Sequence, residues 1–404
     1  MRYPSISLKS IHQQVRDTGM ISQIKKHPRL AARMTEVNTA HGSFATPAFM
    51  PVGTRAAVNC MTVHELQEAG SSIILGGNTY HMLVSPGMNF IQHAGGMHRM
   101  MAWPGPMLTD SGGYQVFSLS RDSKICKIDE VGAKFKHPET GNIISLSPQE
   151  SIATQKIIGA DIIMAFDQCT PEEGGYAAAQ QAMVRTHRWL LESIDAHQHN
   201  VNSAYGYQQY LFGIIQGGSF RDLREQSAEF VMNSGVDGLA IGGESIGYRM
   251  DKTVEILDWV LPYLPEHKTR YTMGVGMHPQ DLIDVVAKGV DIFDCVAPTR
   301  NARHGALLCG RPIIKNDWVV FEEGADRGRI LIKKAEYARD HGPISEGCNC
   351  YTCQHHTRSY LHFLFKTKSL LYAPLACIHN IGMMHQTCEV MRGVIAHHAV
   401  QQSH

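Results

Sequence analysis

The chain has 404 residues, of which 43% are hydrophobic and 18% are charged, and its 37 Lys and Arg residues are balanced by 37 Asp and Glu residues. This composition excludes a disordered chain, because the apolar content is high and little net charge opposes burial. It also excludes a globally basic surface, so nucleic-acid binding would need a local patch. No apolar run has the length of a membrane span or a signal peptide, which predicts a soluble, cytoplasmic protein.

Short apolar runs recur along the chain, each followed by Gly or a polar residue and then by an amphipathic stretch. This pattern predicts repeated βα units. Seven predicted strands cover residues 72–75, 106–109, 161–166, 211–215, 238–241, 271–273 and 290–293. An eighth strand at 306–308 would close an α/β fold of the (β/α)8 or TIM-barrel type. The alternative is an open doubly wound sheet, but no Gly-x-Gly-x-x-Gly follows an early strand, which favours the barrel.

Short polar side chains or a glycine follow six of the predicted strands. These residues are Asn78, Asp110, Asp167, Gln216, Gly243 and Asp294. Active sites of such barrels form where the carboxyl ends of the strands meet, so the group predicts a pocket for a planar polar ligand. For any single Asp or Asn, the alternative is that it only caps the following helix.

Basic residues outnumber acidic ones between positions 299 and 370, where there are 12 Lys and Arg and 7 Asp and Glu. Arg300 and Arg303 lie at the start of this segment. Such a local excess is compatible with RNA binding, but also with a solvated surface that binds nothing.

Three cysteines, Cys348, Cys350 and Cys353, lie within six residues. This spacing is typical of a metal site and not of a disulfide framework. A nearby histidine would complete a tetrahedral Cys3His site, whose natural ion is Zn2+, and four protein ligands would make it a structural site. The alternative is three reduced surface thiols, which oxidise readily. The candidate histidines are His355, His356, His362, His379 and His385.

Four motifs occur together in the chain: Thr-Asp-Ser-Gly-Gly-Tyr at 109–114, Gln-Gly-Gly at 216–218, Asp-Cys-Val-Ala-Pro-Thr-Arg at 294–300, and the cysteine cluster followed by Ile-His-Asn at 378–380. In this order they resemble the tRNA-guanine transglycosylases, also called queuine tRNA-ribosyltransferases. The resemblance implies a transglycosylase TIM-barrel domain over 27–404, with a zinc-binding subdomain at about 309–385. It selects His379 as the fourth ligand of one zinc per chain, and it leaves 1–26 as an N-terminal extension of unknown role.

The resemblance further implies a pentosyltransferase that exchanges the wobble guanine, position 34, of tRNAs with GUN anticodons. Asp294 would be the nucleophile that forms a covalent ribosyl-aspartate, and Asp110 would be the general acid and base. The implied substrate-binding residues are Asn78, Asp110, Ser111, Gly112, Gly113, Tyr114, Asp167, Gln216 and Gly243. The implied RNA-binding residues are Gly274, Asp281, Thr299, Arg300 and Arg303.

The chain departs from the family pattern in the loop of Glu244, Ile246 and Tyr248, where Tyr248 replaces a usual glutamate. Gln168 stands where Glu is common, and 273–279 lacks a usual lysine and has one extra residue. Cys169 and the bulky Ile246 favour a small pocket for the pre-queuosine base, 7-aminomethyl-7-deazaguanine. The alternative is salvaged queuine, whose cyclopentenediol needs more room.

The resemblance implies three partners: the anticodon loop of tRNA, a purine or 7-deazapurine base, and a second copy of the chain in a homodimer. Two other classes remain as alternatives. A serine hydrolase is suggested by Asp-Ser-Gly-Gly at 110–113, but trypsin-like proteases are all-β and carry an Ala-Ala-His-Cys that is absent here. A non-catalytic tRNA-binding partner subunit would have lost its nucleophile, whereas this chain keeps Asp110 and Asp294.

Overall fold

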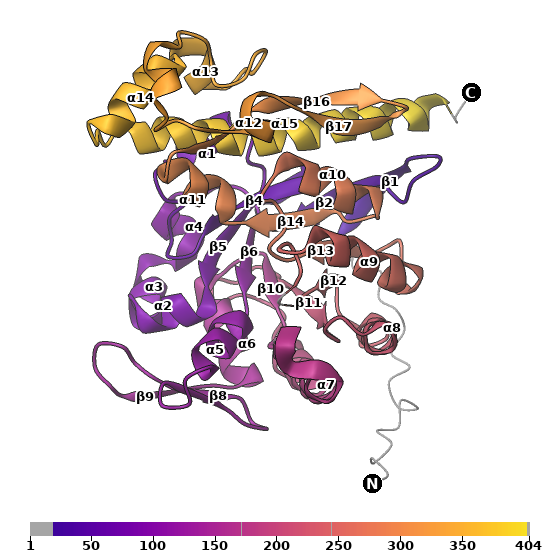
Figure 1. The fold of residues 1–404 in the computed structure, drawn as a ribbon. Helices are drawn as coiled ribbons and strands as arrows, with labels where there is room; N and C mark the ends of the chain where they lie inside the picture. Colours follow the sequence, from indigo (N-terminus) through magenta and orange to yellow (C-terminus); the bar gives the residue numbers. More distant parts are fainter. Residues whose placement is uncertain (1–18, 171, 244, 402–404) are drawn as a thin grey trace.

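A closed barrel of eight parallel strands forms the centre of the molecule in the computed structural model, which describes residues 19–170, 172–243 and 245–401. Helices follow the strands and surround the barrel (Figure 1). The predicted TIM-barrel fold is therefore confirmed. The barrel strands are β4 (Ala48–Gly53), β5 (Ile74–Asn78), β6 (Met107–Asp110), β10 (Ile162–Met164), β11 (Tyr210–Ile215), β12 (Gly238–Ile241), β13 (Thr269–Thr272) and β14 (Ile292–Cys295).

The predicted eighth strand at 306–308 is wrong as a barrel strand. This segment forms β15 (Ala306–Leu308), which pairs antiparallel with β18 (Arg329–Leu331) outside the barrel. The barrel instead closes through β4, which pairs in parallel with β14 on one side and β5 on the other. β4 contains Pro51, and a proline weakens the sequence signal of a central strand because it has no N–H to donate.

The helices around the barrel begin and end at local sequence signals. Ser147 and Glu150 form a capping box at the start of α6, and Gly159 ends that helix in the left-handed conformation. The helices of the barrel region are α1 (Val63–Glu68), α2 (Thr79–Val84), α3 (Met88–Ala94), α4 (Gly96–Met101), α5 (Gly113–Ser120), α6 (Pro148–Ile158), α7 (Gly175–Gln198), α8 (Arg221–Met232), α9 (Met250–Val260), α10 (Pro279–Ala287) and α11 (Ala297–Arg303).

An antiparallel sheet covers the amino end of the barrel. It consists of β1 (Ile21–Lys26), β2 (Arg33–Thr39) and β3 (Gly42–Ala45). Val37 and Phe44 of this sheet pack in one buried cluster with barrel residues such as Phe212 and Ile292. Residues 1–18 of the predicted extension lie outside the described residues, whereas 21–26 form β1. A second sheet, inserted between α5 and α6, comprises β7 (Cys126–Ile128), β8 (Ala133–Lys136) and β9 (Ile143–Leu146).

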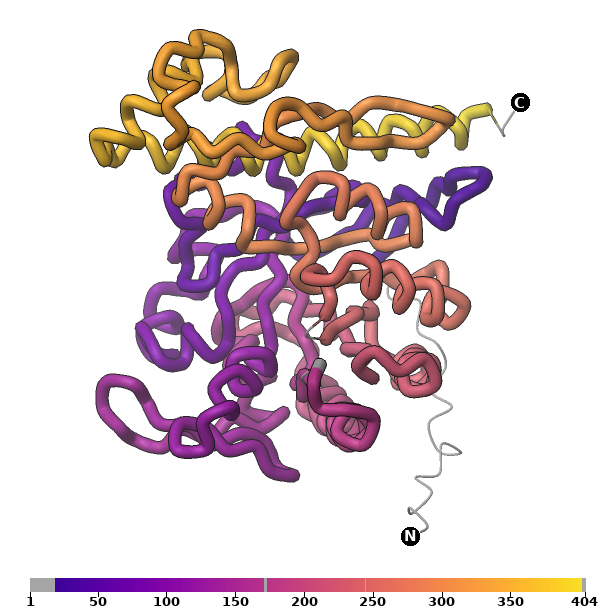
Figure 2. The backbone as a smooth tube through the Cα atoms, in the orientation of Figure 1, coloured from indigo at the N-terminus to yellow at the C-terminus, as the bar shows by residue number. Residues whose placement is uncertain are grey.

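The C-terminal segment lies along one side of the barrel, where Figure 2 shows it in orange and yellow. It contains the hairpin β16 (Gly310–Lys315) and β17 (Trp318–Glu323), followed by α12 (Ala325–Gly328), α13 (Tyr351–His355), α14 (Arg358–Lys366) and α15 (Tyr372–Gln401). The predicted subdomain at 309–385 falls within this segment. Among the described helices, none combines the length and the apolar character that crossing a membrane requires.

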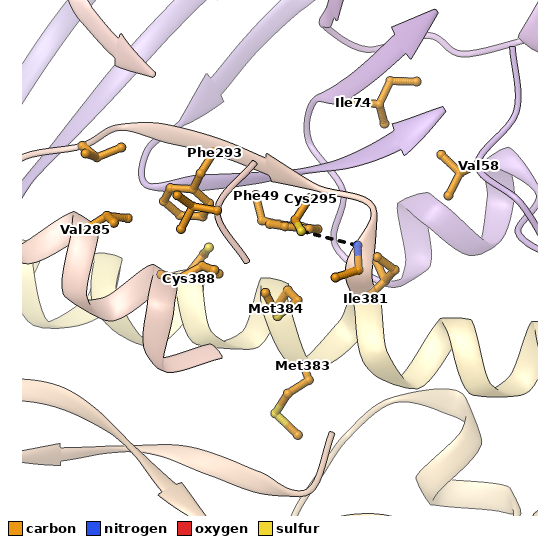
Figure 3. Packing of buried hydrophobic residues seen from close by; sticks show 14 of the residues in the cluster. Phe49, Val58, Ile74, Val285, Phe293, Cys295, Ile381, Met383, Met384 and Cys388 are labelled. Atoms are coloured by element: carbon orange, nitrogen blue, oxygen red, sulfur yellow. Dashed lines mark hydrogen bonds between the residues drawn. The ribbon is translucent and has the colours of Figure 1, made fainter. Parts of the chain in front are cut away.

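Helix α15 anchors this segment to the barrel through a buried apolar interface. Phe49 of β4 and Phe293 of β14 lie near Met384 and Cys388 of α15 (Figure 3). The thiol of Cys295 accepts a hydrogen bond from the Ala297 amide at the same interface. The wall of the barrel that ends in Asp294 is thus backed by the C-terminal helix.

Candidate active site

A cavity of about 300 Å3 opens at the carboxyl ends of the barrel strands. This is the end at which (β/α)8 enzymes carry their active sites. All the residues predicted to bind the substrate line the cavity, namely Asn78, Asp110, Ser111, Gly112, Gly113, Tyr114, Asp167, Gln216 and Gly243. Asp294 lines it as well. The structure therefore brings the predicted catalytic and base-binding residues together.

The carboxylate of Asp294, on β14, is held through one of its two oxygens. Oδ1 accepts a hydrogen bond of 2.6 Å from the Tyr271 hydroxyl and one of 3.1 Å from the Gly274 amide. Both bonds go to Oδ1, so Oδ2 is the candidate attacking atom. Burial raises the pKa of Asp294, although the two hydrogen bonds oppose this shift.

Asp110, at the end of β6, has the pKa of a group that can both donate and accept a proton near neutral pH. Burial, together with the nearby charge of Asp294, raises its pKa to about 7. Asn78 on β5 donates to Asp110 Oδ2 at 3.0 Å and to Gln115 Oε1 at 2.8 Å. These bonds orient the Asp110 carboxyl at the cavity wall.

A row of polar groups from neighbouring strands lines another wall. Gln216 Nε2 donates to Asp167 Oδ2 at 2.8 Å, and Ser111 Oγ donates to Asp167 Oδ1 at 3.4 Å. Burial raises the pKa of Asp167 to about 6. A side chain at Gly113 would not fit, because its Cβ would lie 2.2 Å from Asp167 Oδ1. This wall suits the polar edge of a flat base.

The predicted RNA-binding residues divide into two groups. Gly274 and the exposed Arg300 line the cavity. Asp281 caps α10 by accepting from the His278 amide at 2.8 Å, and the Thr299 hydroxyl donates to the Val296 carbonyl. Arg303 is half-buried, and its Nη1 is buried with no hydrogen-bond partner among the described residues. The structure therefore brings only Gly274 and Arg300 of this set to the cavity.

The sequence did not point to Tyr271, whose hydroxyl holds the Asp294 carboxylate, or to Gln115, which accepts from Asn78 beside Asp110. Tyr271 is fully buried on β13 and carries no chemical motif. The available signal was its place in the predicted strand 271–273, three residues before Gly274. Cys169 and Ile246, predicted to narrow the pocket, line it and are 3% exposed, whereas Tyr248 is 66% exposed at the cavity. Glu244 lies outside the described residues.

The four predicted zinc ligands form one cluster in the C-terminal segment. His379 Nδ1 lies 3.8, 3.4 and 3.3 Å from the sulfurs of Cys348, Cys350 and Cys353. His379 Nε2 donates to the Leu308 carbonyl at 2.7 Å, which leaves Nδ1 free to bind a metal. All four ligand atoms lie within 4.8 Å of one another, a spacing that fits tetrahedral coordination. The cluster can therefore hold one metal ion.

The fold and the site together define a (β/α)8 barrel whose cavity is lined by carboxylates with raised pKa values, an arrangement suited to glycosyl transfer. The family model described as "Queuine tRNA-ribosyltransferase" matches residues 29–403. Three similar curated proteins carry the same name. The chain is 43% identical over 372 residues to the one from Caldanaerobacter subterraneus subsp. tengcongensis, covering 92% of each chain. It is 42% identical over 369 residues to that of Halothermothrix orenii, covering 91% of each. It is 42% identical over 372 residues to that of Staphylococcus aureus strain JH9, covering 92% of this chain and 91% of the relative.

The chain belongs to the queuine tRNA-ribosyltransferase family. It is therefore a transferase of the pentosyltransferase class, a tRNA-guanine transglycosylase that takes part in tRNA processing. Membership of this family rejects the hypothesis of a trypsin-like serine hydrolase, a class whose fold is all-β.

Proposed function

We propose that this transglycosylase replaces the guanine at wobble position 34 of tRNAs with GUN anticodons by the pre-queuosine base, through a covalent ribosyl-aspartate. The observation that carries the proposal is the pairing of two carboxylates at one cavity. The hydrogen bonds from Tyr271 and Gly274 both go to Asp294 Oδ1, so Oδ2 takes part in neither, and Asp110 has a pKa of about 7.

In the first step, Asp294 Oδ2 attacks C1′ of the wobble nucleotide. The bond between C1′ and the guanine N9 breaks while the ester bond between C1′ and Oδ2 forms. Asp110 gives its proton to the departing guanine. Tyr271 and Gly274 hold Oδ1 throughout, so they keep the carboxylate turned toward the sugar.

In the second step, the incoming base loses the N9 proton to Asp110, and its N9 attacks C1′. The ester bond breaks and Asp294 regains its charge. Asp167 and Gln216 hold the polar edge of either base in the same place, which supports an exchange at one site.

The cavity wall supports the pre-queuosine base over queuine. Ile246 and Cys169 line the cavity with buried side chains, which limits the room beside the base. Both bases should be competed against labelled guanine in tRNA. We expect the pre-queuosine base to win with the natural protein and Ile246→Gly to raise queuine use selectively, because the cavity widens without loss of the groups that bind the purine edge. Efficient queuine incorporation by the natural protein would contradict this choice.

Incorporation of labelled guanine into unmodified tRNA tests the exchange reaction itself. A tRNA without guanine at position 34 is the matched control and should take up no label. The alternative, a non-catalytic tRNA-binding partner, predicts tRNA binding without incorporation.

We infer that Cys348, Cys350, Cys353 and His379 hold one structural zinc ion. The donor set of three thiols and one imidazole suits zinc, whose role here would be to fix the C-terminal segment. The homodimer and the cytoplasmic location stay predictions, and the mass of the purified protein in solution checks the first.

A further inference from the structure

Arg224 of α8 is fully buried directly behind the base-binding wall. Its guanidinium donates to three backbone carbonyls: Nε to Gly218 at 2.7 Å, and Nη1 to Ile215 at 2.9 Å and to Gly242 at 2.7 Å. Ile215 ends β11, and Gly242 directly follows β12. One side chain therefore joins the loops that carry Gln216 and Gly243. Arg224 is not among the residues that line the cavity.

The bond to Gly242 determines the direction of the next amide. The peptide between Gly242 and Gly243 is trans, so its C=O and its N–H point in opposite directions. Because the carbonyl is held on Arg224 behind the wall, the N–H of Gly243 is aimed away from Arg224 and toward the cavity that Gly243 lines.

Gly243 is constrained on both sides in this arrangement. Its φ is +135°, and a Cβ at this position would lie 2.6 Å from Arg224 Nη2. Its carbonyl accepts from the Ile246 amide at 3.3 Å. Arg224 thus fills the space behind Gly243 and leaves the peptide little freedom to turn. Burial lowers the pKa of Arg224 to about 10, so the side chain stays a cation at neutral pH.

The order of the strands indicates which atom this amide meets. Asp167 follows β10, Gln216 follows β11 and Gly243 comes after β12, and these three strands are adjacent in the barrel. A guanine-like base presents N–H donors at positions 1 and 2 and an oxygen acceptor at position 6. If the donors face the Asp167 carboxylate, the 6-oxygen faces the wall that Gly243 supplies.

We propose that Arg224 is a positioning residue that determines base specificity: it aims the Gly243 amide at the 6-oxygen of the base and so selects 6-oxopurines. The proposal rests on the proposed function and adds a residue that acts from behind the pocket. Lysine keeps the charge of arginine but lacks the planar fork that spans several carbonyls, so Arg224→Lys removes the orientation and keeps the cation.

The test compares guanine with 6-thioguanine as incoming bases in the release of labelled guanine from tRNA. 6-Thioguanine keeps both N–H groups and replaces the 6-oxygen by sulfur, a weak acceptor. The natural protein should prefer guanine. We expect Arg224→Lys to narrow this preference by about five- to tenfold, the effect of one misaligned hydrogen bond, while the KM for tRNA stays within about twofold.

Arg270→Lys is the matched control. Arg270 is also a buried arginine that donates to backbone carbonyls, including Leu264 at 2.7 Å, but it lies at the amino end of the barrel, where β13 begins. Its variant should lose stability without a change in base preference. Thermal melting shows whether each variant is folded, and Arg224→Gln, which keeps two N–H donors, is used if the lysine variant is not.

Three outcomes would overturn the proposal. They are an unchanged preference in a folded Arg224 variant, an equal change in Arg270→Lys, and the failure of both Arg224 variants to fold, since a residue needed only for folding has no role in base selection. If the natural protein exchanges no guanine at all, the proposed function fails instead.

Discussion

Two buried aspartates flank strand β10, one at each end of the barrel, and their pKa values are shifted in opposite directions. Asp161 directly precedes this strand. Burial raises its pKa, but hydrogen bonds from His41 and His98 outweigh that effect, so the pKa lies at about 2. Asp167 follows the same strand, and burial raises its pKa to about 6. The partners of each carboxylate, and not burial alone, decide its charge.

At strand β14 the contrast lies in the hydrogen-bond partners of two aspartates. Asp291, directly before it, is fully buried and accepts from Arg33 Nε at 2.9 Å and from the Arg270 amide at 2.7 Å. Asp294, three residues later, is held by the Tyr271 hydroxyl and the Gly274 amide. Asp161 and Asp291, before their strands, therefore accept hydrogen bonds from histidine and arginine side chains, whereas Asp294 accepts from a tyrosine hydroxyl and a backbone amide.

The largest expected effect distinguishes Asp294, within β14, from Asp291, directly before it. Asp294→Asn should lower guanine exchange by on the order of 10³-fold or more, because an amide cannot act as the nucleophile. Asp291→Asn should instead destabilise the fold by about 3–5 kcal/mol, since it leaves the Arg33 charge buried without its partner. Exchange kinetics and chemical unfolding of both variants measure this difference. A covalent tRNA adduct formed by Asp294→Asn would contradict the assignment.

In the cysteine cluster, a bound metal ion would stabilise the C-terminal segment, much as the buried Arg33–Asp291 ion pair stabilises the amino end of the barrel. We expect Cys350→Ala to lose the metal and several kcal/mol of stability together, because metal binding and folding are coupled. Cys126→Ala is the control, since Cys126 is buried in β7, apart from the cluster. Full metal occupancy in Cys350→Ala, measured by elemental analysis, would count against the four-ligand site.

The pKa values predict pH effects in different ranges at the two ends. Formation of the covalent adduct needs protonated Asp110, so its single-turnover rate should fall above about pH 7. Asn78→Ala should move this fall to higher pH, because the Asn78 hydrogen bond lowers the pKa of Asp110. Asp161 has a lowered pKa, so its stabilising contribution is present above the unfolded value near 4 and is lost as the pH falls toward about 2. An adduct rate that does not change between pH 6 and 9 would rule out Asp110 as the acid.

The smallest expected effect is on tRNA binding by arginines near the cavity at the carboxyl end of the barrel. Arg300 is exposed at the cavity, so Arg300→Ala should weaken tRNA binding and reduce its salt dependence by about one unit of slope. Arg303 is half-buried, and the slope should change less in Arg303→Ala. Binding of tRNA measured at several salt concentrations checks both. Equal slopes in Arg300→Ala and the natural protein would place the RNA contact elsewhere.

The sequence by itself determined the barrel class, the polar residues at the strand ends and the metal cluster. These features are local: a strand run with its following residue, or three cysteines within six positions, can be recognised without knowledge of distant contacts. The family motifs then assigned roles to Asp110 and Asp294, and the structure places both at one cavity.

Only the tertiary structure decided which strand closes the barrel and how each carboxylate is held. β4 lies more than 200 positions before its partner β14, and Pro51 weakens its local signal. Tyr271 is a buried tyrosine in the short strand β13, and Arg224 is a buried arginine in helix α8. Neither belongs to a sequence motif. Arg33 and Asp291 are 258 positions apart. The pKa of each aspartate depends on such distant neighbours, because burial and charge partners are properties of the folded surroundings and not of the residue's place in the chain.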